Sequence, residues 1–125
     1  MKDRAHGTLS DFTERFARSA DPLALLAGAA IDVRVHPDLL ELPGRVVRGA
    51  WDPLLRRIEL YGARGRSDAE LLTSLAHEMW HAADNDHDEA AAEAFARAWV
   101  AGLAGGQIRR WGLLLRARTG RDGVR

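Results

Sequence analysis

Residues 77–81 read His77-Glu78-Met79-Trp80-His81, an H-E-x-x-H pattern. Its residue types can bind a metal ion and can carry out acid–base chemistry beside it. On a helix, His77 and His81 project from one face with their side chains about 6 Å apart. That separation suits two ligand positions of a tetrahedral Zn²⁺, with each nitrogen at about 2.0–2.1 Å from the metal. Glu78 lies next to both histidines without being a third ligand, so it can take a proton from a water that the metal activates. The pattern predicts a zinc site with its own general base.

The segment before the motif predicts the helix that this spacing requires. Ser67-Asp68-Ala69-Glu70 reads as an S-x-x-E capping box, with Ser67 as the N-cap. On a helical wheel the apolar side of the segment consists of Leu71, Leu72, Leu75, Ala76, Met79, Ala82 and Ala83. His77 and His81 fall on the opposite side, together with Asp84. We therefore expect the helix to bury its apolar side and to turn both histidines toward the space in front of it.

A second helix should follow closely. Asp84-Asn85-Asp86 is typical of a turn, and Asp88 reads as the N-cap of an alanine-rich helix that runs to about Leu103. Turn and cap roles account for the three aspartates, Asp84, Asp86 and Asp88, more simply than metal binding does. A helix that begins with a carboxylate directly after H-E-x-x-H can deliver a third metal ligand.

The second helix carries a family resemblance. Glu89-x-Ala91-Ala92-Glu93-x-Phe95-Ala96 resembles the E-x-E-A-[ND]-x-F-A signature that follows H-E-x-x-H in the ImmA/IrrE-like metallopeptidases, which are gluzincins. The run from Leu75 to Glu78 resembles their L-A-H-E segment, and the resemblance spans residues from about 45 to 100. It implies a zincin-like fold, one Zn²⁺ per chain, Glu89 as the third ligand and Glu93 as a support for the site. Ala91 and Glu93 depart from the signature, and only seven residues separate His81 from Glu89, fewer than is usual in the family.

His87 is the alternative third ligand. The spacing from His81 to His87 matches that of metzincins and of SprT- and WLM-type zincins, which use a third histidine. Metzincins have glycine where this chain has Asp84, and no later methionine can form their Met-turn, since the methionines are Met1 and Met79. We favour Glu89 and leave His87 open.

The resemblance implies a zinc endopeptidase that hydrolyses peptide bonds in a protein or peptide substrate, with Glu78 as general base. A regulatory intracellular role is one option within that class. Two other functions stay open: a SprT- or WLM-type zincin with His87 as ligand that acts on DNA-associated protein, and a non-catalytic regulatory or partner module that zinc stabilises. The intact Glu78 argues against the module, because a structural site needs no base. A C-terminal segment that lay across the cleft, either the last helix or residues 119–125, would make the enzyme latent.

Composition limits the remaining function classes. A chain of 125 residues is expected to form one domain, residues 1–125, with a tail at 119–125 that we expect to be disordered. The net charge is zero, which argues against nucleic acid as a partner. The chain has no cysteine, so a metal must be held by histidine and carboxylate. No apolar run approaches the roughly 20 residues that span a membrane, and the first seven residues lack the apolar core of a secretory signal, so we expect a cytoplasmic protein.

The pattern of elements predicts an α+β fold, in which helices pack on one face of a small, mainly antiparallel three-stranded sheet. We expect further helices at 8–20, 22–29 and 107–118, and strands at 31–35, 45–51 and 56–61. Gly105-Gly106 should break the chain before the last helix, whose arginines Arg109, Arg110, Arg116 and Arg118 should form a solvated face. By resemblance to zincins, strand 56–61 should run along the cleft edge and pair with the substrate; the alternative is an ordinary edge or central strand.

Three aromatic residues are weaker candidates. Trp80 either walls a substrate pocket or packs against the N-terminal helices. Tyr61 is the only tyrosine and a candidate to stabilise an oxyanion, and His36 reads as a residue of a surface loop.

Overall fold

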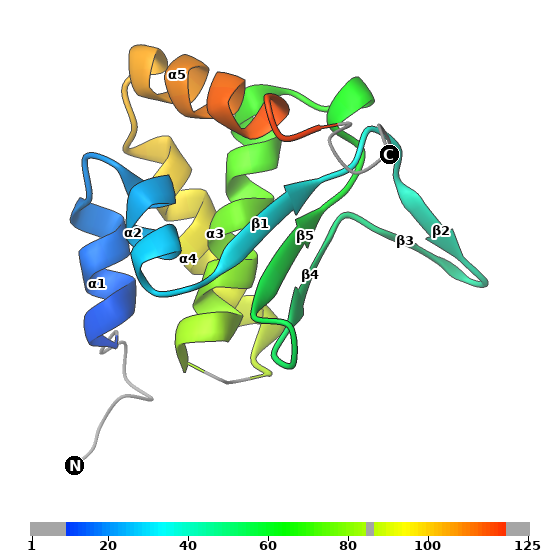
Figure 1. Ribbon diagram of the computed structural model, residues 1–125, viewed down its shortest axis with the longest axis horizontal. Coiled ribbons are helices and arrows are strands. Elements are labelled where there is room, and N and C mark those ends of the chain that lie inside the picture. Colours follow the sequence, from blue (N-terminus) through cyan, green and yellow to red (C-terminus); the bar gives the residue numbers. More distant parts are fainter. Residues whose placement is uncertain (1–9, 85–86, 120–125) are drawn as a thin grey trace.

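The computed structural model describes residues 10–84 and 87–119 (Figure 1). The helices are α1 (Asp11–Arg18), α2 (Pro22–Gly28), α3 (Asp68–Asp84), α4 (Glu89–Ala101) and α5 (Gly105–Arg116). The strands are β1 (Asp32–Val35), β2 (Leu40–Leu42), β3 (Arg45–Val47), β4 (Gly49–Asp52) and β5 (Arg57–Leu60), and a short 3-10 helix, η2, covers Ala63–Gly65. The α+β class is confirmed. No helix among the described residues combines the length and the apolar character that a membrane span requires.

The main sheet is mixed, which corrects the expectation of a mainly antiparallel sheet. Its strand order is β1-β5-β4, and β5 is parallel to β1 and antiparallel to β4. Strands β4 and β5 form an antiparallel hairpin that turns just after Asp52. Because β5 is paired on both sides, it cannot accept a further strand, so its predicted place at the cleft edge is wrong. Strands β1 and β4 form the edges of this sheet.

The predicted strand 45–51 is divided between two sheets. Residues Arg45–Val47 pair with β2 in a separate two-stranded hairpin, whereas Gly49–Asp52 pair with β5. Arg48 lies between the two, and its carbonyl accepts hydrogen bonds from the Tyr61 N–H at 3.0 Å and from Arg66 Nη1 at 3.3 Å. The hairpin turns at Pro43-Gly44, where Gly44 adopts a φ of 82° that favours glycine. Figure 1 shows this β2–β3 hairpin projecting away from the helices.

The core lies between one face of the main sheet and the helices. Inward-facing residues of β1 and β5 are buried, and they are Val33, Val35, Ile58 and Leu60. The alternate residues of these strands face away from the helices and pair with one another, as Arg57 does with Asp32 and Glu59. Helix α3 runs through the middle of the molecule, between the sheet and the other helices (Figure 1). Its fully buried apolar residues are Leu71, Leu72, Leu75, Ala76 and Met79, as the wheel predicted.

Both predicted helix starts around the motif are confirmed. The Ser67 hydroxyl accepts from the Glu70 N–H at 3.1 Å, and the Glu70 carboxylate accepts from the Ser67 N–H at 2.8 Å, which is a capping box. Asp88 caps α4 by accepting from the Ala91 N–H at 3.0 Å. Asp84 ends α3 and accepts from the buried Thr13 hydroxyl at 3.0 Å, which ties α3 to α1.

The last helix differs from its prediction in two respects. It begins at Gly105, because the break falls at Gly102–Ala104 rather than at Gly105-Gly106. Arg116 is not part of a solvated face: it donates to the Asp68 carboxylate at 2.9 Å and to the carbonyls of Ala63 and Arg66 at 2.6 and 2.7 Å. These bonds hold α5 against the start of α3. Thr119 forms a bridge with Val35, and the rest of the predicted tail, 120–125, lies outside the described residues.

Candidate metal centre

Three side chains of the motif region converge at one point. His77 Nε2 lies 2.8 Å from Glu89 Oε1, and His81 Nε2 lies 3.2 Å from Glu89 Oε2. One ligand atom from each of these three residues can be chosen so that all lie within 4.8 Å of one another. The two imidazole rings meet edge to face, with centroids 5.0 Å apart. The structure thus brings together the three residues that the sequence and its resemblance assigned to a metal.

The packing of α4 on α3 delivers Glu89 to the histidines. Ala92 and Ala96, one turn apart on α4, are fully buried, as is Ala76 of α3. Small side chains let two helix backbones approach closely, so the first residue of α4 can reach across to α3. Glu89 occupies that first position, where the partial positive charge of a helix N-terminus favours a carboxylate. Burial raises the pKa of Glu89, but hydrogen bonds and charge from His77 and His81 outweigh this and leave the pKa below its usual value.

Glu93 fixes the ring of His77 from behind. Its Oε1 lies 2.9 Å from His77 Nδ1, while its Oε2 accepts from Arg97 Nε at 2.7 Å. This contact with a candidate ligand histidine agrees with the supporting role that the resemblance implied for Glu93. A carboxylate on Nδ1 holds its proton there and leaves Nε2 with the lone pair that a metal needs.

Glu78 is the one acidic residue of α3 that is almost fully buried, with 9% of its surface exposed. It faces β4 at Gly49: a Cβ added to Gly49 would lie 3.2 Å from Glu78 Oε2 and 3.3 Å from its Cγ. Glycine at this position lets the strand backbone pass close to the carboxylate. Burial raises the pKa of the Glu78 carboxyl, against the lowering effect of His77 and His81. A carboxyl with a raised pKa is a better proton acceptor.

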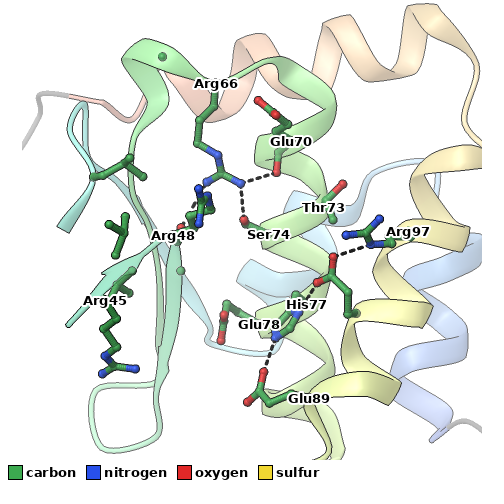
Figure 2. Close-up of a pocket in the computed structure, with 16 residues that line it drawn as sticks. Arg45, Arg48, Arg66, Glu70, Thr73, Ser74, His77, Glu78, Glu89 and Arg97 are labelled. Atoms are coloured by element: carbon green, nitrogen blue, oxygen red, sulfur yellow. Dashed lines mark hydrogen bonds and ion pairs between the residues drawn. The ribbon is translucent and has the colours of Figure 1, made fainter. Parts of the chain in front are cut away.

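A groove of about 720 Å³ runs past these residues, between α3 and the β3–β4 segment (Figure 2). One wall is formed by Leu39 and residues 45–49, and the other by α3 and the first turns of α4. His77, Glu78, Glu89 and Glu93 line it at one end. The described part of the C-terminal segment, α5 and Thr119, contributes no residue to its lining, so the last helix does not block it.

The weaker candidates lie elsewhere. Trp80 is 8% exposed, belongs to the core, contacts His81 edge to face and does not line the groove, so it is a core residue rather than a pocket wall. Tyr61 does not line the groove; it stacks on His36, with ring centroids 4.7 Å apart. His36 is half-buried at the end of β1 and its Nε2 lies 2.6 Å from Glu59 Oε1. His87 is exposed in the connection before α4 and is not among the grouped ligands.

The sequence reasoning missed the β3–β4 wall. Gly49 carries a weak signal, because an isolated glycine inside a strand pattern often marks a close backbone approach. Arg66, which precedes the capping box, also lines the groove, and no local pattern distinguishes it from other basic loop residues.

The donor set fits a zinc ion. Two imidazole nitrogens and one carboxylate oxygen are ligands that Zn²⁺ prefers, and three protein ligands leave a fourth position for reacting groups. Ligand atoms around a tetrahedral zinc lie about 3.4 Å apart, given bonds of about 2.0–2.1 Å. The distances from Glu89 to His77 and His81, 2.8 and 3.2 Å, need only small side-chain shifts to reach that value.

Comparisons of the chain with known protein families, with curated proteins and with solved structures find no match. What the structure itself establishes is a small α+β domain in which His77, His81 and Glu89 could hold a metal ion.

Proposed function

We propose that this protein is a zinc-dependent endopeptidase of the gluzincin type. The observation that carries the proposal is the convergence of His77, His81 and Glu89 within 4.8 Å, next to the buried Glu78 and at one end of an open groove. A metal site that only stabilises a fold is closed and needs no adjacent base. Here a base lies in the groove beside the ligands, which favours catalysis over a purely structural zinc.

His77, His81 and Glu89 would hold the ion. When bound, Zn²⁺ supplies positive charge that polarises a carbonyl group and lowers the pKa of water toward neutrality. Glu93 keeps the His77 ring oriented through its contact with Nδ1.

Glu78 performs the proton transfers. Its carboxylate accepts a proton from the attacking water and then donates it to the nitrogen of the departing amine. The backbone of Gly49 passes so close to Glu78 that a Cβ there would contact the carboxylate, which places the carboxylate against this wall of the groove. The raised pKa of Glu78 suits both transfers, because a group with a pKa nearer neutrality accepts and releases protons with a smaller energy difference.

The edge strand β4 would position the substrate. β4 pairs with β5 on one side only, and Gly49 of β4 lies against Glu78. An extended peptide that lies in the groove can pair with backbone groups of such an edge by β-augmentation. This would bring its carbonyl groups past Glu78 and the histidines.

A Glu78→Gln variant tests the proposal. The substitution keeps the shape of the side chain and all three candidate ligands, so we expect about one zinc per chain and a loss of turnover by at least about 100-fold. The assay follows cleavage of a mixed peptide library by mass spectrometry, with Glu14→Gln on α1 as the matched control for losing a carboxylate.

Two results would count against the proposal. Equal turnover by wild type and Glu78→Gln would exclude Glu78 as the base. A wild type that binds zinc but cleaves no peptide or unfolded protein would instead support the non-catalytic module.

A further inference from the structure

The groove has a second, strongly basic region apart from the metal centre. Four arginines line it: Arg45, Arg48, Arg66 and Arg97. Arg97 is already paired with Glu93 at 2.7 Å. Within the described ranges, no carboxylate forms an ion pair with the other three. The carboxylate of Glu70 also lines the groove and acts on Arg66 without forming an ion pair, so the three arginines outnumber the one nearby carboxylate and this part of the groove carries net positive charge.

Arg66 is a fixed charge in the wall of the groove. Its guanidinium donates to the carbonyls of Tyr61 and Arg48, at 2.9 and 3.3 Å, and to the carbonyl of Glu70 and the hydroxyl of Ser74, at 2.9 and 2.6 Å. All four acceptors are neutral. The interactions hold the guanidinium in place and leave its charge available to a ligand.

Arg48 is the exposed partner of this fixed charge. Its side chain is exposed at the junction of β3 and β4, and Figure 2 shows its guanidinium beside that of Arg66, near Ser74. Burial lowers the pKa of Arg66, Glu70 opposes this, and the charge of Arg48 lowers the pKa further, so the two guanidinium charges interact. Two adjacent cations in a concave surface attract an anionic group, and arginine pairs with carboxylates through two parallel hydrogen bonds. Arg45 lies apart from the pair in Figure 2.

The spacing along α3 gives the distance from the reacting bond. Ser74 and Glu70, which Arg66 contacts, precede Glu78 by one and two helical turns, which is about 6–12 Å along the axis. An extended peptide rises about 3.3 Å per residue. Two to four peptide residues therefore cover this distance, within the reach of one bound substrate.

We propose that Arg48, supported by Arg66, forms a subsite for the carboxylate of an aspartate or glutamate in the substrate, two to four residues from the scissile bond. The assignment rests on the proposed function for its placement relative to cleavage. It makes the preferred substrate a peptide with an acidic residue on one side of the bond that is cut.

Binding tests the subsite separately from catalysis. The full chain with Glu78→Gln and added Zn²⁺ is titrated with nonapeptides that are acetylated and amidated at their ends, so that the only acidic group is one glutamate at a chosen position. Matched peptides carry glutamine instead. We expect the glutamate peptides to bind about five- to tenfold more tightly at low salt, at one position or two adjacent ones, with the preference shrinking as salt rises.

Two charge reversals locate the subsite. Arg48→Glu should abolish the preference for glutamate over glutamine, while Arg45→Glu, which changes the net charge of the same groove equally, should retain most of it. Equal loss in both variants would show general attraction and overturn the subsite, as would the absence of any preference. Tighter binding only of a phosphoserine peptide, or only of a peptide with a free C-terminal carboxylate, would overturn the assignment to an acidic side chain.

Cleavage by the wild type then separates the two proposals. Acidic peptides that bind with the expected preference but are never cut would support the subsite and contradict the peptidase. Peptides that are cut with no preference for glutamate would support the peptidase and contradict the subsite.

Discussion

Replacing Glu93 with alanine removes the carboxylate that holds the ring of His77. Glu93 Oε1 lies 2.9 Å from His77 Nδ1, and no other hydrogen bond to Nδ1 is seen within the described residues. Without it, the ring gains rotational freedom and loses the group that keeps the proton on Nδ1. Zinc affinity should fall even though His77, His81 and Glu89 are all still present.

The size of the loss follows from the exposure of the contact. Groups that orient a metal-binding histidine typically contribute about 10–100-fold in affinity. The side chain of Glu93 is 38% exposed, so water can replace part of the interaction and the lower end applies. We expect zinc to bind about tenfold more weakly to Glu93→Ala, which corresponds to about 1.4 kcal/mol.

Competition with a chromophoric chelator measures the zinc affinity directly, and thermal unfolding of each metal-free variant checks that the fold is intact. Arg97→Ala is the matched control, because it removes the partner of Glu93 Oε2 and leaves the contact with His77. It should weaken zinc binding by no more than about twofold, since exposed i,i+4 pairs contribute about 0.3–0.5 kcal/mol. Glu93→Gln retains an oxygen acceptor and should fall between the two. Wild-type affinity in a folded Glu93→Ala would refute the orienting role.

Three further changes test other parts of the account. Gly49→Ala places a methyl group about 3.2 Å from Glu78 Oε2, so turnover should fall by about tenfold with zinc content unchanged; an unchanged cleavage rate would show that the carboxylate can move freely. Burial lowers the pKa of His77, but hydrogen bonds to its two carboxylate partners outweigh this and raise it above 6.5 in the metal-free protein. The stabilisation from the protonated ring is therefore complete below pH 6.5 and is lost as the pH rises through the raised value, and zinc must displace this proton. Apparent zinc affinity should accordingly rise by about tenfold per pH unit up to that pKa, and a flat profile in chelator competition between pH 6 and 8 would contradict the prediction. Arg116→Ala should destabilise the fold by about 2 kcal/mol in urea unfolding, because one ion pair and two hydrogen bonds to carbonyls are lost, whereas Arg109→Ala on the same helix should change stability by less than about 0.5 kcal/mol.

The local features of the site could be predicted because short stretches of sequence determine them. The capping box at Ser67 and Glu70 and the N-cap at Asp88 place the starts of α3 and α4 through bonds between residues three apart. The helical period then places His77 and His81 on one face. Local sequence alone could not predict the position of Glu89, since the approach of α4 to α3 depends on how Ala92 and Ala96 pack. The assignment of Glu89 as a metal ligand came instead from the resemblance of its helix to the metallopeptidase signature.

The arrangement of the strands could not be read from local patterns. Arg45 to Trp51 has the composition of one strand, but its two halves pair with different partners on either side of Arg48, and pairing over a distance leaves no local signature. The parallel pairing of β1 with β5 joins segments about 25 residues apart. It makes β5 the central strand, so β4 rather than β5 is the edge strand beside the groove. The β2–β3 hairpin did leave a signal: Leu40–Leu42 and Arg45–Val47 flank a two-residue Pro43-Gly44 turn.

The basic part of the groove also could not be predicted from local sequence. Arg48 and Arg66 are eighteen residues apart and look like any other arginines of the chain until the fold places them together. Arg116 was misjudged for the same reason, because its partners Asp68, Ala63 and Arg66 come from a distant segment.

The most direct test of the central claim is the zinc content of the purified wild type beside Glu89→Ala and His87→Ala, measured by atomic emission after dialysis against zinc and then buffer. The account predicts about one zinc per chain in the wild type and in His87→Ala, and a clear loss in Glu89→Ala. Loss only in His87→Ala would make the site a three-histidine centre, and no bound zinc in any of the proteins would contradict a metal centre at His77, His81 and Glu89.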